Sequence, residues 1–361
     1  MIAYNESRWV VAVKYLKIFI FLIIMMFSFF FRAKLDISEV KETVLPKNIL
    51  TDEDYKRDMI DELGNIPIMM YHGIVNKEGT YQGNYDNDGY TRTLSAFRND
   101  LEMYYQKGYR MIKLDDYIHG RIDTEYGYSP IILTFDDGND NNILVDGIDD
   151  NGDIIINKYS AVYVLEEFKK KYPDYNVTAT FFVTDSLFNQ AEYNEKIVKW
   201  LIEHGYSIGN HTKHHDNLSK IDNDKIGNTI GYMYSKLNSI IGDNYSKIVA
   251  LPFGAPYNRD SDKFPYIIDS KYKEITYHTD AILRVGWEPE FSPFNKKVDM
   301  TYLKRCRAYD NDGKDFDIEY VFKMLDKNRY ISDGNKDTIV STKSKSDMIN
   351  NSYKLEVILY E

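Results

Sequence analysis

Cysteine and surplus positive charge are what this sequence has least of. Cys306 is the single cysteine among 361 residues, which excludes a disulfide framework within one chain and a cysteine-based zinc site. Lysine and arginine total 45 against 56 aspartate and glutamate residues, so the formal net charge is −11. Binding to phosphate backbones needs clustered positive charge, and we therefore expect no nucleic-acid partner. With 43% hydrophobic and 28% charged residues, the composition is that of a globular chain and excludes wholesale disorder.

Long apolar runs are also scarce, with one exception near the N-terminus. Residues 18–31 read IFIFLIIMMFSFFF without a charge, and Lys14 and Lys17 precede them. A membrane span needs about 20 apolar residues, or fewer where flanking basic side chains reach the interface. Arg32 follows the run where a signal-peptide cleavage site would have small residues. We therefore expect residues 1–32 to be an uncleaved signal-anchor at the cell membrane, with the rest outside the cytoplasm; secretion after cleavage is the alternative.

The remaining chain alternates strand-like and helical patterns after a charged stretch at residues 33–64, which we interpret as a spacer. This alternation predicts parallel strands with helices outside them, an α/β layered or barrel fold. We expect the main domain at residues 65–342 and a C-terminal extension at 343–361. The predicted strands are 66–71, 130–135, 178–183, 206–209, 248–251, 281–285, 339–341 and 355–360. The predicted helices are 93–107, 193–204 and 221–241.

An acidic cluster at residues 149–153 lies between two apolar runs. It has neither the 12-residue ligand spacing nor the closing glutamate of a calcium-binding loop. Asn151–Gly152 at its centre is instead typical of a tight turn between two strands. The cluster therefore predicts a β-hairpin.

Two adjacent carboxylates follow the second predicted strand. Residues 134–138 read TFDDG, which places Asp136 and Asp137 at the carboxyl end of a buried strand. Ligands and catalytic groups collect at that end in α/β folds. Two neighbouring carboxylates repel each other and favour a bound cation. Asp-Asp-Gly is also common in plain turns, so this motif needs support from a second one.

A histidine cluster supplies that support. Three of the seven histidines lie within residues 211–215, and His211 and His215 are four positions apart, so one turn can aim both at a single point. Two imidazoles and one carboxylate form a site for a divalent metal that leaves positions open for water and substrate. His72, in a Tyr-His-Gly sequence after the first predicted strand, could add a third imidazole to the same mouth.

These motifs resemble those of the polysaccharide deacetylase family, carbohydrate esterase family 4. TFDDG at residues 134–138 is similar to the family's first motif, and HTKHH at 211–215 to its H-[ST]-x-x-H motif. The resemblance covers roughly residues 66–341. The opening IPIMMYHGI further resembles a circularly permuted subgroup that contains the deacetylases of poly-N-acetylglucosamine.

The resemblance implies a distorted (β/α) barrel that hydrolyses N-acetyl groups of cell-wall or exported N-acetylglucosamine polysaccharide, such as peptidoglycan or poly-N-acetylglucosamine, and releases acetate. It implies one divalent metal ion, zinc before cobalt or nickel, held by Asp137, His211 and His215. Asp136 would be the general base. His72 matches the Y-H motif of the permuted subgroup and would be the general acid.

The chain departs from the family pattern in two places. Residues 250–254 read ALPFG in place of R-x-P-[FY]-G, so Ala250 stands where most members have an arginine that holds the catalytic aspartate. The Pro-Phe-Gly part remains, and the amide of Phe253 is the candidate donor to the oxyanion of the reaction. The late Leu-x-His motif is also absent. In the permuted subgroup that this chain resembles, that histidine comes from the N-terminal side, and His72 is at the matching position. The candidate replacements for the missing arginine are Arg284, Arg305 and Arg307.

Three interpretations remain at this point. The first is the deacetylase, and Trp287 could stack on a sugar ring of its substrate or simply pack in the core. The second is a catalytically inactive, deacetylase-like module that binds glycan, which Ala250 and the missing late histidine favour. The third is a metal hydrolase that cleaves another amide or an ester, since a site determines the reaction type better than the substrate.

Overall fold

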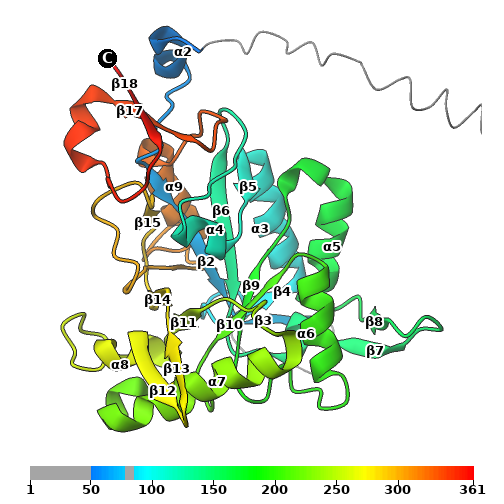
Figure 1. The fold of residues 1–361 in the computed structure, drawn as a ribbon. Coiled ribbons are helices and arrows are strands. Elements are labelled where there is room, and N and C mark those ends of the chain that lie inside the picture. The colour runs from blue at the N-terminus through cyan, green and yellow to red at the C-terminus, as the bar shows by residue number, and fades with distance from the viewer. Residues whose placement is uncertain (1–49, 78–84) are drawn as a thin grey trace, which may run out of the picture. The chain divides into compact units, whose positions relative to one another are not determined.

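A curled parallel sheet organises the part of the chain that the computed structural model describes, residues 50–77 and 85–361 (Figure 1). The chain divides into two units, Met1–Thr51 and Asp52–Glu361. The predicted signal-anchor at residues 1–32 lies outside the described residues. Within the described ranges, no helix is both long and apolar enough to cross a membrane.

The central sheet has eight strands, and all its pairings are parallel. Seven strands follow one another in the order β14-β11-β10-β9-β6-β2-β16, and β5 pairs with β6 beside this path. Their bounds are β2 (Ile68–Tyr71), β5 (Tyr109–Met111), β6 (Ser129–Phe135), β9 (Thr180–Val183), β10 (Ser207–Asn210), β11 (Ile248–Ala250), β14 (Ala281–Leu283) and β16 (Cys306–Arg307).

Helices cover the outside of this sheet, and small two-stranded sheets extend it. The helices are α2 (Asp52–Arg57), α3 (Leu94–Gln106), α4 (Leu114–Ile118), α5 (Ala161–Lys171), α6 (Asn194–Glu203), α7 (Ile226–Ile241), α8 (Phe264–Ile268) and α9 (Ile318–Asn328). The added strand pairs are β1 (Asn65–Ile66) with β15 (Glu290–Phe291), β3 (Gly73–Val75) with β4 (Thr91–Thr93), β7 (Val145–Ile148) with β8 (Ile154–Ile156), β12 (Asp269–Tyr272) with β13 (Ile275–His278), and β17 (Thr338–Thr342) with β18 (Glu356–Tyr360).

Local sequence explains the elements that lead to the site. All seven residues of β6 are buried, which matches the continuous apolar run expected of a parallel strand covered on both faces. Thr93 caps α3, because its side-chain oxygen accepts a hydrogen bond from the Ala96 amide at 3.2 Å. Gly108, with φ +82°, follows the end of that helix. These features confirm the predicted strand at residues 130–135 and the predicted helix at 93–107.

One segment is hydrogen-bonded to both edges of the curled sheet. Leu303 bridges Leu283 of β14, donating to the Ile282 carbonyl at 2.8 Å and accepting from the Arg284 amide at 2.9 Å. A few residues later, Cys306–Arg307 pairs with Met69 and Met70 of β2 at the other edge. The segment between these pairings therefore bridges the two edges of the curled sheet.

The α/β class and the β-hairpin are confirmed. Parallel strands alternate with covering helices, and β7 and β8 form an antiparallel pair around Asn151–Gly152. Several elements had no counterpart in the sequence prediction, namely β5, α5, β16 and α9. The strands β5 and β16 are only three and two residues long, which is too short for a period to show. Helix α9 does carry an apolar pattern, with Ile318, Val321, Phe322 and Leu325 buried on one face, and the sequence prediction did not use it.

Residues 52–64 of the predicted spacer belong to the second unit of the chain. Helix α2 lies in residues 33–64, and Glu62 is 1% exposed. The Glu62 carboxylate accepts hydrogen bonds from the Tyr330 hydroxyl at 2.7 Å and the Val340 amide at 2.9 Å. Residues 343–361 are likewise integrated, since β18 pairs with β17. Charged side chains make many of these contacts, so composition alone suggested a solvated linker.

We expect Glu62 to make stability fall as the pH rises. Burial first, and the charge of Asp333 second, raise the pKa of Glu62 to about 8. Because the unfolded chain titrates near the ordinary value of about 4.3, the folded state holds the extra proton between about pH 4.3 and 8. The unfolding free energy should therefore decline across this window by on the order of a few kcal/mol, and no further above it.

Glu62→Gln tests this by urea unfolding at pH 5, 6, 7 and 8. The variant should lose less stability than the parent as the pH rises. Glu53→Gln, at an exposed position of α2, is the control and should follow the parent. Parallel curves for the parent and Glu62→Gln would contradict the assignment.

Candidate metal and catalytic site

The predicted site residues meet at the carboxyl ends of four strands. Asp136 and Asp137 follow β6, His211 follows β10, His72 follows β2, and Phe253 lies just after β11. The strands β2, β6, β9, β10 and β11 are neighbours in the sheet. Parallel strands present their carboxyl ends at one edge, which is why residues distant in sequence come together here.

Asp137, His211 and His215 form the cluster that the sequence predicts. The Nε2 atoms of His211 and His215 lie 3.3 and 3.4 Å from Oδ1 of Asp137. All three candidate ligand atoms lie within 4.8 Å of one another. Two ligand atoms bound about 2.1 Å from one ion at a tetrahedral angle are about 3.4 Å apart. The donor set and its spacing therefore fit one divalent metal ion with coordination positions left open.

A hydrogen bond outside the cluster orients the buried histidine. Nδ1 of His211 lies 2.8 Å from the carbonyl oxygen of Ala250, and a proton on Nδ1 leaves Nε2 free to bind metal. Burial opposes a charge on this ring, but Asp136 and then Asp137 outweigh it and raise the pKa of His211. The carbonyl of Ala250 thus supports the metal site even though the Ala250 side chain carries no functional group.

The backbone around the cluster has an uncommon conformation. Asp137, Thr212 and His215 have positive φ values of 74°, 62° and 56°. Left-handed residues other than glycine cost about 1–3 kcal/mol each and persist where surrounding contacts hold them. Gly138, with φ +64°, must be glycine, because a Cβ atom there would lie 2.1 Å from the Leu187 carbonyl oxygen. The strain sits on the residues that carry the ligands, which is typical of functional sites.

Arg305 is the partner of Asp136. Its two terminal nitrogens donate to the two carboxylate oxygens at 2.7 and 2.6 Å, and its side chain is 0% exposed. It also donates to the Thr134 hydroxyl at 3.2 Å and to the Arg284 carbonyl at 3.3 Å. Burial would raise the pKa of Asp136, but Arg305 and His211 outweigh burial and hold that pKa well below its usual value. Asp136 is therefore an anion at neutral pH.

This pairing decides between the three arginines that the sequence left open. Arg305 belongs to the segment that crosses from β14 to β2, whereas the family arginine would extend from the position of Ala250 on β11. Arg284 instead donates to the Val285 carbonyl at 3.0 Å. Arg307 lies over the ring of Trp287 at 4.1 Å. The structure thus supplies the missing group from a segment about 50 residues later in the chain, between the two edges of the sheet.

His72 lies beside the same carboxylate. Its Nε2 is 3.9 Å from Oδ2 of Asp136, and its ring contacts Tyr90 at a centroid distance of 5.1 Å. Nδ1 is buried and has no hydrogen-bond partner among the described residues. Burial lowers the pKa of His72, with Asp136 opposing the shift, so the ring is neutral at neutral pH. This position places an imidazole in reach of a proton near Asp136.

The two predicted substrate contacts lie at the exposed rim. Phe253 is 55% exposed, has φ 58°, and its ring packs edge-on against His215 at 4.5 Å. Trp287 is 42% exposed, so it is not a core residue. His214, the third histidine of the cluster sequence, is exposed and lies outside the ligand set.

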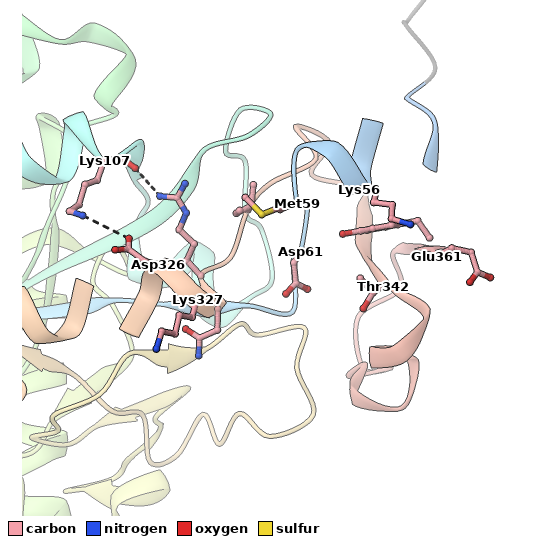
Figure 2. A pocket seen from close by; sticks show the side chains of 12 residues that line it. Lys56, Met59, Asp61, Lys107, Asp326, Lys327, Thr342 and Glu361 are labelled. Carbon is pink, nitrogen blue, oxygen red and sulfur yellow. Dashed lines mark hydrogen bonds and ion pairs between the residues drawn. The ribbon is translucent and has the colours of Figure 1, made fainter. Parts of the chain in front are cut away.

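A cavity of about 500 Å³ elsewhere in the molecule is not part of this site (Figure 2). It is lined by α2, the end of α9 and the β17–β18 pair. Lys107 and Asp326 form an ion pair on its wall, with 3.8 Å between Nζ and Oδ1. None of the residues that line it belongs to the predicted catalytic, metal or substrate set.

The chain thus has a parallel α/β sheet with one carboxylate and two imidazoles at its carboxyl edge. Metal-dependent hydrolases have sites of this type. Residues 124–264 match the family model described as polysaccharide deacetylase. Both motifs, at residues 134–138 and 211–215, lie within this segment, and the match agrees with the resemblance that they carry.

One curated relative is similar to part of this chain. A peptidoglycan-N-acetylglucosamine deacetylase of Bacillus cereus is 32% identical over 130 residues, which cover 36% of this chain and 38% of the relative. The chain therefore matches less than half the length of that relative.

Two solved structures are similar. A polysaccharide deacetylase of Bacillus cereus has 19% identity and a TM-score of 0.48, covering 67% of this chain and 64% of the other. A Streptococcus pyogenes deacetylase in complex with acetate has 19% identity and a TM-score of 0.46, covering 67% and 91%.

Removal of Arg305 should destabilise the protein through Asp136. Arg305→Met leaves a buried carboxylate without its partner, which typically costs about 3–5 kcal/mol. Asp136→Asn in the same chain removes the uncompensated charge, so the double variant should be more stable than Arg305→Met alone. Urea unfolding of the parent, both single variants and the double variant measures this coupling. Equal stability of Arg305→Met and the double variant would show that the ion pair has no such role.

Loss of either ligand histidine should abolish tight metal binding. His211→Ala and His215→Ala should each weaken zinc affinity by more than about 100-fold, because loss of a supporting group alone costs about 10–100-fold. Competition with a chromophoric chelator measures the affinity. His215 is half-exposed, so its variant should fold even if the His211 variant does not. His214→Ala is the control, and a similar loss in that variant would overturn the ligand assignment.

Proposed function

We propose that this protein is a metal-dependent hydrolase that removes N-acetyl groups from N-acetylglucosamine-containing polysaccharide and releases acetate. The observation that carries the proposal is the Asp136–Arg305 pair, 2.6 Å between Nη2 and Oδ2, adjoining the Asp137–His211–His215 cluster. An ionised carboxylate beside a candidate metal site is the arrangement that hydrolysis of an amide by water requires. The match to the polysaccharide deacetylase family supports the acetamide as the bond cleaved.

The residues divide the reaction between them. A bound divalent metal, with zinc preferred over cobalt or nickel, would polarise the acetamide carbonyl and acidify a water molecule. Asp136 takes a proton from the attacking water, and Arg305 holds its carboxylate in one orientation. The amide of Phe253 is the proposed donor to the oxyanion that develops.

His72 completes the proton balance. The carbon–nitrogen bond breaks as the leaving nitrogen receives a proton, and His72 is the proposed donor. Because burial keeps the resting ring neutral, His72 must first gain a proton. Asp136, whose Oδ2 is 3.9 Å from Nε2, is the adjacent group that has just taken one from water. Water is consumed, and acetate and the free amine leave.

We propose the substrate from the relative's name. The Bacillus cereus relative is named as a peptidoglycan-N-acetylglucosamine deacetylase, and peptidoglycan or poly-N-acetylglucosamine is the proposed polymer here. We also propose that the chain belongs to the permuted subgroup, since β2 with His72 precedes β6 with the TFDDG motif. A signal-anchor at residues 1–32 would hold the domain at the outer side of the cell membrane.

The inactive glycan-binding module loses its main support. Ala250 and the missing late histidine favoured that alternative. Arg305 pairs with Asp136 in place of an arginine at position 250, and His72 lies beside the same carboxylate. Both groups that the motif comparison lacked are therefore represented at the site.

Metal-dependent acetate release tests the proposal. The full chain, stripped of metal and reloaded with zinc, cobalt or nickel, should release acetate from chitooligosaccharide, poly-N-acetylglucosamine or peptidoglycan. Asp136→Asn and His72→Ala should each lower kcat by about 10²–10⁴-fold, the usual contribution of a positioned acid or base. Glu53→Gln is the control and should retain the parent rate. Tight metal binding without acetate from any of these glycans would exclude the deacetylase function for them.

A further inference from the structure

Arg307 lies between two aromatic rings at the rim of the site. Its guanidinium carbon is 4.1 Å from the centre of the Trp287 ring and 5.2 Å from that of Tyr90. Trp287 is 42% and Tyr90 48% exposed. Two exposed rings that flank a cation form a surface with one apolar and one charged component.

This arginine has no acidic partner among the described residues. Its guanidinium contacts the two rings, and its Nε is buried without a hydrogen-bond acceptor among the described residues. The neighbouring acid Asp310 pairs instead with Arg92 at 2.8 Å. In a chain with a net charge of −11, a half-buried cation without a counter-ion is conspicuous. Its charge is available to a ligand.

The cation is also held in place. A Cβ atom at Gly89 would lie 3.1 Å from Cδ of Arg307, so the backbone there approaches the arginine stem closely. The flanking rings contact the guanidinium from their faces, and this cation–π contact orients the group. Guanidinium donors point outward in the plane of the group, where they can bind both oxygens of a carboxylate or phosphate. The donors of the stacked Arg307 guanidinium therefore remain able to bind an anion.

Its position is next to the catalytic groups. Arg307 belongs to β16 and lies two residues after Arg305, which pairs with Asp136. Tyr90, which contacts Arg307, also contacts His72 at a centroid distance of 5.1 Å. A sugar chain with its acetamido group at Asp136 would extend past His72 toward this surface.

We propose that Arg307, flanked by Trp287 and Tyr90, is a subsite for a carboxylate or phosphate on the sugar next to the one that is deacetylated. The proposal rests on the glycan substrate proposed above and narrows it to an anionic polymer. The exposed rings would pack against the sugar, and Arg307 would select its charge. The local cation offsets the repulsion that a chain of net negative charge exerts on an anionic substrate.

Matched ligands test this subsite by direct binding. We would measure Kd by calorimetry for the metal-loaded full chain with oligosaccharides that carry a carboxylate on the neighbouring sugar, the methylamide of that carboxylate, or a phosphate. The parent should bind at least one anionic ligand about 10-fold or more tightly than the methylamide, as expected for a charge-assisted hydrogen bond. Arg307→Gln should remove this preference and change the methylamide Kd by less than about twofold.

Further variants separate the charge from the fold. Arg307→Lys should keep part of the preference for the anionic ligands. Trp287→Ala should weaken the binding of all three ligands. Arg121→Gln removes a charge from an exposed arginine paired with Asp116, and it should leave the preference intact. The carboxylate and phosphate arms identify which anion the subsite takes.

Specific outcomes would overturn the subsite. These are a parent without preference, no binding of any ligand, or an equal loss for all ligands in Arg307→Gln. Acetate release is measured separately on the same ligands. A charge preference in binding without acetate release would contradict the proposed function and leave the subsite standing.

Discussion

The buried ion pair between Asp136 and Arg305 is the constraint on which the site depends. A carboxylate that is 2% exposed is costly to bury as an anion, and only a closely matched cation with further hydrogen bonds offsets that cost. Arg305 supplies both, and Thr134 and the Arg284 carbonyl accept from two of its three remaining donors. The segment that carries Arg305 must therefore be fixed next to Asp136, and its bonding to both sheet edges holds it there.

The source of this arginine shows how the pairing of a carboxylate can be kept while a motif changes. Ala250 lacks the side chain that the motif comparison expects, but its carbonyl still accepts from His211 at 2.8 Å. The charge comes instead from the segment between β14 and β16. The Asp136 carboxylate needs two parallel donors from one guanidinium next to it. Which strand carries that arginine matters less.

The site combines a buried floor with an exposed rim. Asp136, His211 and Arg305 are almost fully buried, and low exposure strengthens their electrostatic interactions. Phe253, Trp287 and Tyr90 are about half-exposed and surround the floor with aromatic surface. The floor carries the proposed chemistry, whereas the rim is accessible to a polymer that enters from solvent. This division matches a reaction at one acetamido group of a long chain.

Local patterns in the sequence determined the elements and the groups that act within a few residues of one another. The apolar run of β6 and the pairs Asp136–Asp137 and His211–His215 each lie within a few residues of the chain, so their spacing was visible in the sequence. Only the tertiary structure chose Arg305 over the other arginines and drew Glu62 into the fold. Those contacts join residues far apart in the chain, and they depend on which sheet edges meet and how deeply each charge is buried. A linear sequence contains the candidates for such pairs, but the folded sheet selects among them.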